Sequence, residues 1–301
     1  MMGFVRLLLL TDANAINHRQ FQVPMNARAA PLGPGPPYVQ SDVMISGVLL
    51  DLAGVIYEGE RALPGALEAV NRLRRAGLSL RFVTNTTRMT KHVVLQRLAR
   101  LGLGVTESEL FTPAQAAREW LARNDCSPSL LVHPDLVQEF QDDSDRADRA
   151  VVVGDAGEAF HYASLNRAFR ELIDGAKLIA LAKNRSFKDA DGTLSLDAGA
   201  FVAALEFASR RTALVLGKPA PGFFEAALTS MDCPPKHAVM VGDDAEADVA
   251  GALRAGLGGA VLVRTGKYTR GDEERFGPPP TVTVENLSAA ADWIVAHSPR
   301  S

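Results

Sequence analysis

The chain has 301 residues, of which 47% are hydrophobic and 22% charged, and its formal net charge is −3 at pH 7. At about 150 residues per domain this length allows roughly two domains, and the composition excludes disordered and collagen-like chains. The charge provides no basic excess for nucleic acid or anionic membranes, so we expect neither as a partner. Cys126 and Cys233 belong to no disulfide or zinc pattern, which favours a reducing, cytoplasmic location.

We expect residues 1–43 to form a disordered N-terminal extension. Residues 1–10 are mostly apolar, but Asp12 follows soon and no small-residue cleavage site is obvious, which disfavours a signal peptide. Residues 24–37 are rich in proline, glycine and alanine, as in a linker. Folding is expected to begin near Met44, which could also be the initiator; the sequence leaves this open. No apolar run reaches the roughly 18 residues that a membrane-spanning helix requires.

Beyond this extension, short apolar runs alternate with helical patterns of period 3.6, which is typical of βαβ units and a parallel sheet. Thr112 followed by Pro113 predicts a helix N-cap and a first helical position. The fold class is therefore α/β, with a doubly wound parallel sheet buried on both faces. In chain order, strands are expected at about 45–51, 79–84, 129–133, 150–154, 177–182, 213–217, 238–242 and 260–264. Helices are expected at about 65–76, 89–101, 113–123, 164–174, 197–209, 221–231, 246–255 and 287–297.

Polar residues end or directly follow four of the predicted strands. Ligands of parallel sheets bind beyond the carboxyl ends of the strands, so we expect these residues to meet at one edge of one sheet. Each alone could be a turn residue, a helix cap, a solvated cation or a loop residue. Together they combine carboxylates for a hard cation such as Mg²⁺ with a lysine and a hydroxyl for phosphate oxygens, as phosphoryl transfer requires. The residues are Asp51, Thr84 with Asn85, Lys218, and Asp243 with Asp244.

The order of these motifs resembles the haloacid dehalogenase superfamily of phosphatases. The resemblance covers about residues 44–297, and it is carried by the segments 51–55, 83–85, 217–219 and 241–244 together with Asp248. Segments 242–252 and 264–268 resemble its type IIA subfamily, in which a large cap is inserted between the second and third motifs. The resemblance implies a Rossmann-like catalytic core over 44–127 and 212–301, with an inserted α/β cap domain over 128–211.

The resemblance also implies a covalent mechanism that depends on Mg²⁺. Asp51 matches the nucleophile, whose carboxylate attacks phosphorus to form an aspartyl-phosphate that water then hydrolyses. The carboxylates of Asp51 and Asp243 and the main-chain carbonyl of Ala53 match metal ligands. The substrate would be a small phosphorylated molecule or a phosphoamino acid.

The remaining motif residues match groups that bind phosphate or support the site. Thr84 would donate a hydrogen bond to the phosphoryl group, assisted by the backbone N–H of Asn85. Lys218 would offset the charge of the nucleophile and the phosphate. Asp244 or Asp248 would orient Lys218 or a metal-bound water.

Ala53 departs from the superfamily pattern, which usually has a second aspartate two residues after the nucleophile as a general acid. Loss of general acid catalysis typically costs about 10²–10⁴ in rate, so we expect alkyl phosphates to be poor substrates. Phosphoramidates such as phosphohistidine and phospholysine, and pyrophosphate, depend less on this acid, and the resembling subgroup also tends to lack it. The alternative is a regulatory protein that binds a phosphate ligand with little or no turnover.

The predicted cap would close over the strand ends and exclude water. Lys183, Asn184 and Arg185 follow one of its predicted strands, so they could direct donors at an anionic substrate, with Asn184 as the candidate; a solvated basic turn is an equal alternative. Residues 189–192 lack most ligands of a calcium loop and are expected to form a hairpin turn. A homodimer formed through the cap is also expected.

Overall fold

The computed structural model describes residues 44–141, 146–188 and 193–298. The predicted N-terminal extension, 1–43, and the predicted hairpin turn, 189–192, lie outside the described residues. Among the described helices, none combines the length and the apolar character needed to cross a membrane.

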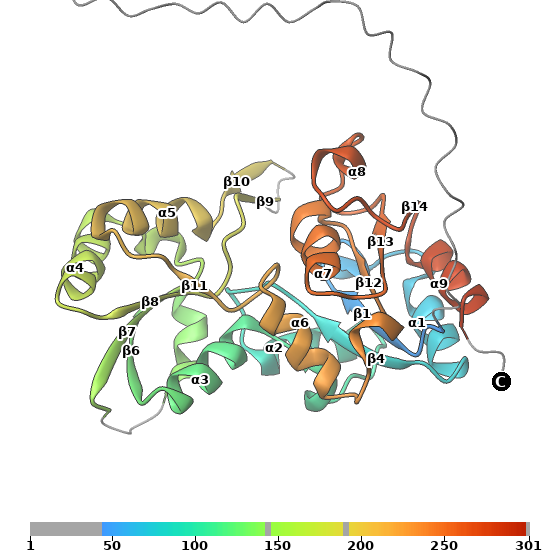
Figure 1. Ribbon diagram of the computed structural model, residues 1–301, viewed down its shortest axis with the longest axis horizontal. Helices are drawn as coiled ribbons and strands as arrows, with labels where there is room; N and C mark the ends of the chain where they lie inside the picture. Colours follow the sequence, from blue (N-terminus) through green and yellow to red (C-terminus); the bar gives the residue numbers. More distant parts are fainter. Residues whose placement is uncertain (1–43, 142–145, 189–192, 299–301) are drawn as a thin grey trace, which may run out of the picture. The chain divides into compact units, whose positions relative to one another are not determined.

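The first sheet has six parallel strands in the order β14-β13-β12-β1-β4-β5 (Figure 1). Alternate side chains of its strands enter two separate apolar clusters: Leu50 packs with helices on one face and Leu49 with helices on the other. The strands are β1 (Gly47–Asp51), β4 (Ser79–Val83), β5 (Leu110–Phe111), β12 (Ala238–Gly242), β13 (Gly259–Val263) and β14 (Val282–Val284). One face is covered by α1 (Ala66–Arg75), α2 (Lys91–Arg100) and α9 (Leu287–Ala296), the other by α6 (Pro221–Thr229), the π-helical segment η5 (Ala245–Ala250) and α7 (Gly251–Arg254).

The second sheet has four parallel strands in the order β11-β8-β7-β6, and it also has helices on both faces. Its side chains likewise alternate, because Val152 packs with one set of helices and Val151 with the other. The strands are β6 (Cys126–Leu131), β7 (Asp148–Val153), β8 (Lys177–Ala180) and β11 (Leu214–Val215). The helices are α3 (Pro113–Arg123) and η2 (Pro134–Phe140) on one face, and α4 (Tyr162–Ile173) and α5 (Ala198–Ser209) on the other. The α/β fold class is confirmed.

One strand does not belong to the sheet to which we assigned it. The predicted strand 213–217 was expected beside the others at the edge of one sheet, but β11 pairs with β8 in the second sheet, with Leu214 opposite Ile179. A short apolar run predicts a strand but does not indicate which strand pairs with it. The strand β11 pairs with the edge of β8 that β7 does not occupy. Lys218 therefore reaches the first sheet from a strand of the second. The division at 127/128 and 211/212 stays a prediction, while the second sheet itself extends from Cys126 to Val215.

Most elements that the sequence did not predict are short, including the strands β5 and β14 of the first sheet, whereas the unpredicted η2 has seven residues. Runs of two to four residues carry too little periodicity to identify a strand or a helix. The predicted helix 246–255 is a π-helical turn that continues into α7. The further elements are β2 (Tyr57–Glu58), β3 (Arg61–Ala62), β9 (Ser186–Lys188), β10 (Leu194–Leu196), α8 (Asp272–Arg275) and the 3₁₀ turns η1 (Glu107–Glu109), η3 (Gly157–Ala159) and η4 (Pro235–His237).

The predicted start of α3 can be tested through its cap. Thr112 is buried and its side chain accepts a hydrogen bond from the backbone N–H of Gln115 at 3.3 Å, directly before Pro113. Thr112→Ala should lower the free energy of unfolding by about 1 kcal/mol, since it leaves a helical N–H without a partner. Urea unfolding measures the change, and Thr229→Ala, at the exposed end of α6, is the control. Equal losses in both variants would contradict the assigned cap.

Candidate active site

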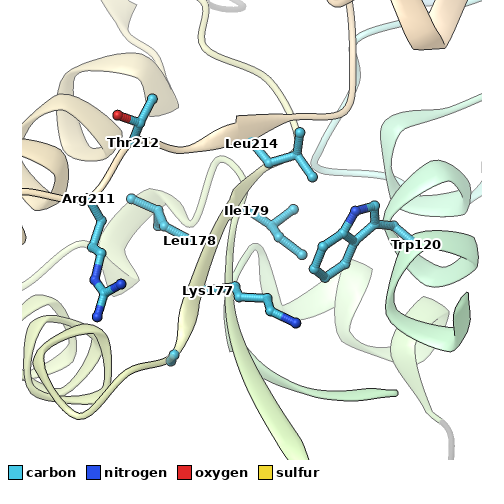
Figure 2. Close-up of a pocket in the computed structure, with 8 residues that line it drawn as sticks. Trp120, Lys177, Leu178, Ile179, Arg211, Thr212 and Leu214 are labelled. Atoms are coloured by element: carbon cyan, nitrogen blue, oxygen red, sulfur yellow. The ribbon is translucent and has the colours of Figure 1, made fainter. Parts of the chain in front are cut away.

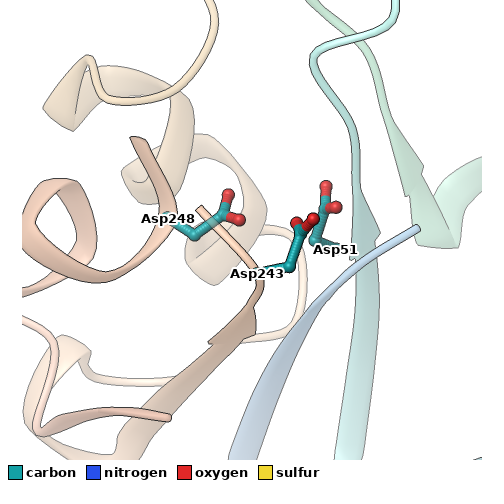
Figure 3. A group of neighbouring side chains, drawn as sticks. All are labelled: Asp51, Asp243 and Asp248. Atoms are coloured by element: carbon teal, nitrogen blue, oxygen red, sulfur yellow. The ribbon is translucent and has the colours of Figure 1, made fainter. Parts of the chain in front are cut away.

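Three buried carboxylates meet at the carboxyl end of the first sheet (Figure 3). Asp51 ends β1, Asp243 directly follows β12, and Asp248 lies in η5. Because β1 and β12 are parallel neighbours, with Leu50 opposite Val241, their ends lie side by side. Each aspartate has an oxygen within 4.8 Å of one from each of the other two. This arrangement concentrates oxygen ligands in a space the size of a single cation site.

Lys218 is buried between two of these carboxylates. Its Nζ lies 2.5 Å from Asp51 Oδ1 and 2.7 Å from Asp248 Oδ1, and only 2% of the residue is exposed. Burial alone lowers the pKa of a lysine, but the attraction of Asp248 and Asp51 outweighs it and raises the pKa of Lys218 above its usual value. The lysine is therefore charged throughout the physiological range.

Asn85 positions Lys218 through its side chain. Asn85 Nδ2 donates to the Lys218 carbonyl at 2.8 Å, and the Lys218 N–H donates to Asn85 Oδ1 at 2.9 Å. The same Nδ2 donates to Asn184 Oδ1 at 3.3 Å, which joins the first sheet's loop to the segment after β8. Thr84, buried at the end of β4, accepts a hydrogen bond from the Thr86 N–H at 3.2 Å. The sequence assigned a role to the backbone N–H of Asn85 and missed this side-chain clamp.

Two glycines surround Asp243 so closely that no larger residue fits. Gly54 and Gly266 both have positive φ angles, 84° and 62°, and a Cβ on either would overlap Asp243 Oδ2. The same oxygen accepts a hydrogen bond from the Lys267 N–H at 2.7 Å, and Thr265 Oγ1 donates to the Gly54 carbonyl. The turn after β13 is therefore fixed against both the loop that follows β1 and Asp243.

Lys267 is a residue of this site to which the sequence argument assigned no role. Its Nζ lies 3.7 Å from Asp244 Oδ2, while Asp244 Oδ1 accepts hydrogen bonds from the backbone N–H groups of Glu246 and Ala247. Burial lowers the pKa of Lys267, but Asp244, Asp243 and the other acids raise it overall. The signal that identified the other residues applied here too, because Lys267 closely follows the predicted strand 260–264.

Asp244 and Asp248 have different partners. Asp248 contacts Lys218 directly, and its Oδ2 accepts a hydrogen bond from the Asp244 N–H at 3.2 Å. Asp244 instead caps η5 and pairs with Lys267. Ala53 is exposed beside Asp51 and has only its methyl group where the superfamily pattern places an acid.

The predicted basic turn after β8 has mixed partners. Asn184 faces Asn85, whereas Lys183 Nζ pairs with Glu206 of α5 at 2.6 Å. Arg185 Nε lies 3.6 Å from Glu246 Oε2 at the start of η5. Of the three residues, Asn184 contacts the loop after β4 and Arg185 contacts η5.

The charges of the cluster fit a divalent cation. Asp51, Asp243, Asp244 and Asp248 provide four carboxylates, and Lys218 and Lys267 provide two ammonium groups. If the four buried groups, Asp51, Asp243, Asp248 and Lys218, are all ionised, an excess of two negative charges remains in a buried space, which is costly without a further cation. Mg²⁺ prefers carboxylate and carbonyl oxygens. Asp51, Asp243 and the carbonyl of Ala53 would hold it.

A separate cavity of about 270 Å³ lies between α3 and the second sheet (Figure 2). Its walls include Trp120, Lys177 and Arg211. Lys177 Nζ lies 3.3 Å from Asp148 Oδ2 and 5.5 Å from the centre of the Trp120 ring. None of the clustered aspartates lines this cavity, so it is not the acidic site.

Comparison with known proteins identifies the class. A family model described as haloacid dehalogenase-like hydrolase matches residues 48–155, and a second, described as HAD-hydrolase-like, matches residues 215–290. The chain belongs to the haloacid dehalogenase-like hydrolases, as its motifs predicted.

Individual relatives narrow this class to its phosphatases. The chain is 46% identical to haloacid dehalogenase-like hydrolase domain-containing protein 2 of Rattus norvegicus over 254 residues, covering 84% of this chain and 97% of the relative. It is 44% identical to phospholysine phosphohistidine inorganic pyrophosphate phosphatase of Xenopus laevis over 263 residues, covering 84% and 95%. The p-nitrophenyl phosphatase structure from Archaeoglobus fulgidus matches with a TM-score of 0.75 and 27% identity, covering 83% and 99%. The predicted phosphatase is confirmed, and the binding-only alternative is not favoured.

The raised carboxyl pKa values predict that metal binding depends on pH. Burial, with Asp51 and Asp248, raises the pKa of Asp243 well above its usual value. Burial, opposed by Lys218 and reinforced by Asp51, raises the pKa of Asp248 to about 7. Protons would therefore compete with Mg²⁺ near neutral pH, and the affinity should rise from pH 6 to pH 8, by at most about tenfold per pH unit for each proton displaced.

Titration calorimetry in buffers of different ionisation enthalpy measures both the affinity and the protons released. Asp243→Ala should weaken Mg²⁺ binding and reduce proton release, whereas Asp292→Asn, which alters an exposed pair with Arg72, is the control. Unchanged Mg²⁺ affinity in Asp243→Ala would refute the metal assignment.

Proposed function

We propose that this protein is a Mg²⁺-dependent phosphatase that acts through an aspartyl-phosphate at Asp51. The observation that carries the proposal is the 2.5 Å contact of Asp51 Oδ1 with Lys218 Nζ inside a buried cluster of carboxylates. A carboxylate held by a charged lysine and surrounded by metal-ligating oxygens has both the nucleophilic atom and the positive charge that phosphoryl transfer requires.

Four residues of the chain have separate roles in the proposed reaction. A carboxylate oxygen of Asp51 attacks phosphorus, and Lys218 stabilises the charge that accumulates on the phosphoryl oxygens. The Thr84 hydroxyl and the Asn85 N–H donate to the same oxygens, while Asn85 also holds Lys218 in place. Bound Mg²⁺ supplies neutralisation of the phosphate charge. Water then hydrolyses the aspartyl-phosphate and regenerates Asp51.

Ala53 limits the substrates that the site can use efficiently. Without a carboxylic acid at this exposed position, a leaving group receives no proton from the residue that usually gives one. The nitrogen of a phosphoramidate can be protonated before the P–N bond breaks, so that it leaves as a neutral amine or imidazole. Pyrophosphate releases a stabilised phosphate when the bond to its bridging oxygen breaks. The phosphohistidine, phospholysine and pyrophosphate named for the Xenopus laevis relative support these classes. Asn184, which lies after β8 beside Asn85, is the residue of the predicted cap that we propose to contact substrate.

Cytoplasmic location and a homodimer formed through residues 128–211 stay predictions. Light scattering of the purified chain tests the second of them.

The covalent mechanism predicts the behaviour of Asp51→Asn. An amide cannot attack phosphorus, so phosphate release should fall by at least about 10³-fold on every substrate while the protein still folds. Steady-state phosphate release from pyrophosphate, phosphohistidine, phospholysine and p-nitrophenyl phosphate measures this, with circular dichroism as the check on folding. Full activity in the variant would remove the covalent mechanism, and saturable binding by the wild type without turnover would restore the binding-only alternative.

Ala53→Asp tests the account of substrate choice. A restored acid should raise kcat/KM on an alkyl phosphate by up to about 10²-fold, within the usual contribution of general acid catalysis. The gain should be small on p-nitrophenyl phosphate and smaller still on pyrophosphate and phosphohistidine, whose leaving groups need less help. Equal gains on all substrates would instead place the effect of Ala53 in a common step, such as activation of the hydrolytic water.

A further inference from the structure

Lys267 has a fixed backbone next to the reaction centre. Its N–H is bound to Asp243 Oδ2, and the preceding Gly266 lies against the same carboxylate. Thr265 ties the turn to the carbonyl of Gly54, three residues after the nucleophile. The turn that bears Lys267 is therefore positioned by the nucleophile loop and by a candidate metal ligand together.

The ammonium group of Lys267 is available, unlike that of Lys218. Lys218 Nζ is occupied by carboxylate oxygens at 2.5 and 2.7 Å, and its side chain is 3% exposed. Lys267 Nζ lies 3.7 Å from Asp244 Oδ2, which is too long for a hydrogen bond. Within the described part of the chain Nζ has this ion pair and donates no hydrogen bond, and 36% of the side chain remains exposed. Its three N–H donors can therefore serve a substrate anion.

We propose that Lys267 is a specificity-determining residue that binds the leaving phosphoryl group of a diphosphate substrate such as pyrophosphate. The inference rests on the proposed function, because it assigns the second phosphoryl group of a substrate whose first group reacts at Asp51. Lys218 and the metal serve the reacting group, and Ala53 offers the leaving group neither a proton nor a charge. Lys267 supplies positive charge to the leaving group.

The reaction balances without a proton from the protein. At neutral pH the leaving half of pyrophosphate carries a proton of its own. An Asp51 oxygen forms a bond to one phosphorus, and the bond between that phosphorus and the bridging oxygen breaks. The electron pair departs on the bridging oxygen, so the products are aspartyl-phosphate and hydrogen phosphate. The Lys267 ammonium neutralises the charge that grows on the departing oxygen.

Other leaving groups gain little from this cation. The nitrophenoxide of p-nitrophenyl phosphate carries no second phosphoryl group for the ammonium to bind. The imidazole of ring-protonated phosphohistidine leaves as a neutral group, to which an ammonium offers no charge attraction. Lys267 should therefore favour pyrophosphate over both.

The test compares Lys267→Gln with Lys267→Arg and with the control Lys177→Gln, which removes a lysine paired with Asp148 at 3.3 Å in the second sheet. Lys267→Gln should lower kcat/KM for pyrophosphate by about 10–100-fold, the usual effect of removing a hydrogen bond to a charged group. The change on p-nitrophenyl phosphate and phosphohistidine should stay below about threefold. Lys267→Arg should recover most of the pyrophosphate activity, and Lys267→Met replaces the glutamine variant if that variant does not fold.

Binding provides a second readout that does not depend on turnover. Calorimetry with Mg²⁺ should show weaker binding of imidodiphosphate to Lys267→Gln by about tenfold, with phenylphosphonate, which has one phosphoryl group, nearly unchanged. Equal losses on all three substrates, or unchanged pyrophosphate turnover and imidodiphosphate binding, would overturn the role of Lys267. A wild type without turnover, or an active Asp51→Asn variant, would refute the proposed function instead, and the binding comparison would still decide the inference.

Discussion

The ion pairs of Lys218 with Asp51 and Asp248 are the interaction on which the rest of the site depends. A buried ammonium or carboxylate is costly unless paired, and removing one partner of such a pair typically costs about 3–5 kcal/mol. Lys218 can meet this condition only where β1 and η5 bring their carboxylates within 2.5 and 2.7 Å of its Nζ. Asp51, Lys218 and the end of the sheet are thus fixed by one electrostatic requirement.

That requirement also explains why the site remains negative. One lysine shared by two carboxylates leaves Asp243 without a buried cation, and its only hydrogen-bond donor given by the structure's described residues is the Lys267 N–H. The glycines at 54 and 266 bring backbone up to this oxygen, where a side chain would block access. A divalent cation would balance the negative charge that the lysines leave. Burial and the neighbouring carboxylates raise the pKa values of Asp243 and Asp248.

The sequence predicted the residues of the site better than their partners. Asp51, Thr84 and Asp243 end or follow strands of one parallel sheet, so strand ends alone predicted that they would meet. Asn85 and Lys218 are 133 residues apart, and no local pattern indicates that an amide side chain clamps the lysine backbone. The assignment of β11 failed for the same reason: sheet membership depends on a distant partner, β8, and not on the strand's own residues.

Lys218 and Lys267 have different surroundings because they follow strands of different sheets. Lys218 follows β11 of the second sheet and enters the interior, where carboxylates occupy its ammonium. Lys267 follows β13 of the first sheet and stays at the surface of the cluster, with a partner that is itself engaged in capping η5. Ala53 provides no carboxylic acid two residues after Asp51, so we propose that positive charge assists the departing group instead. Such a site discriminates between leaving groups by the charge they carry more than by the proton they need.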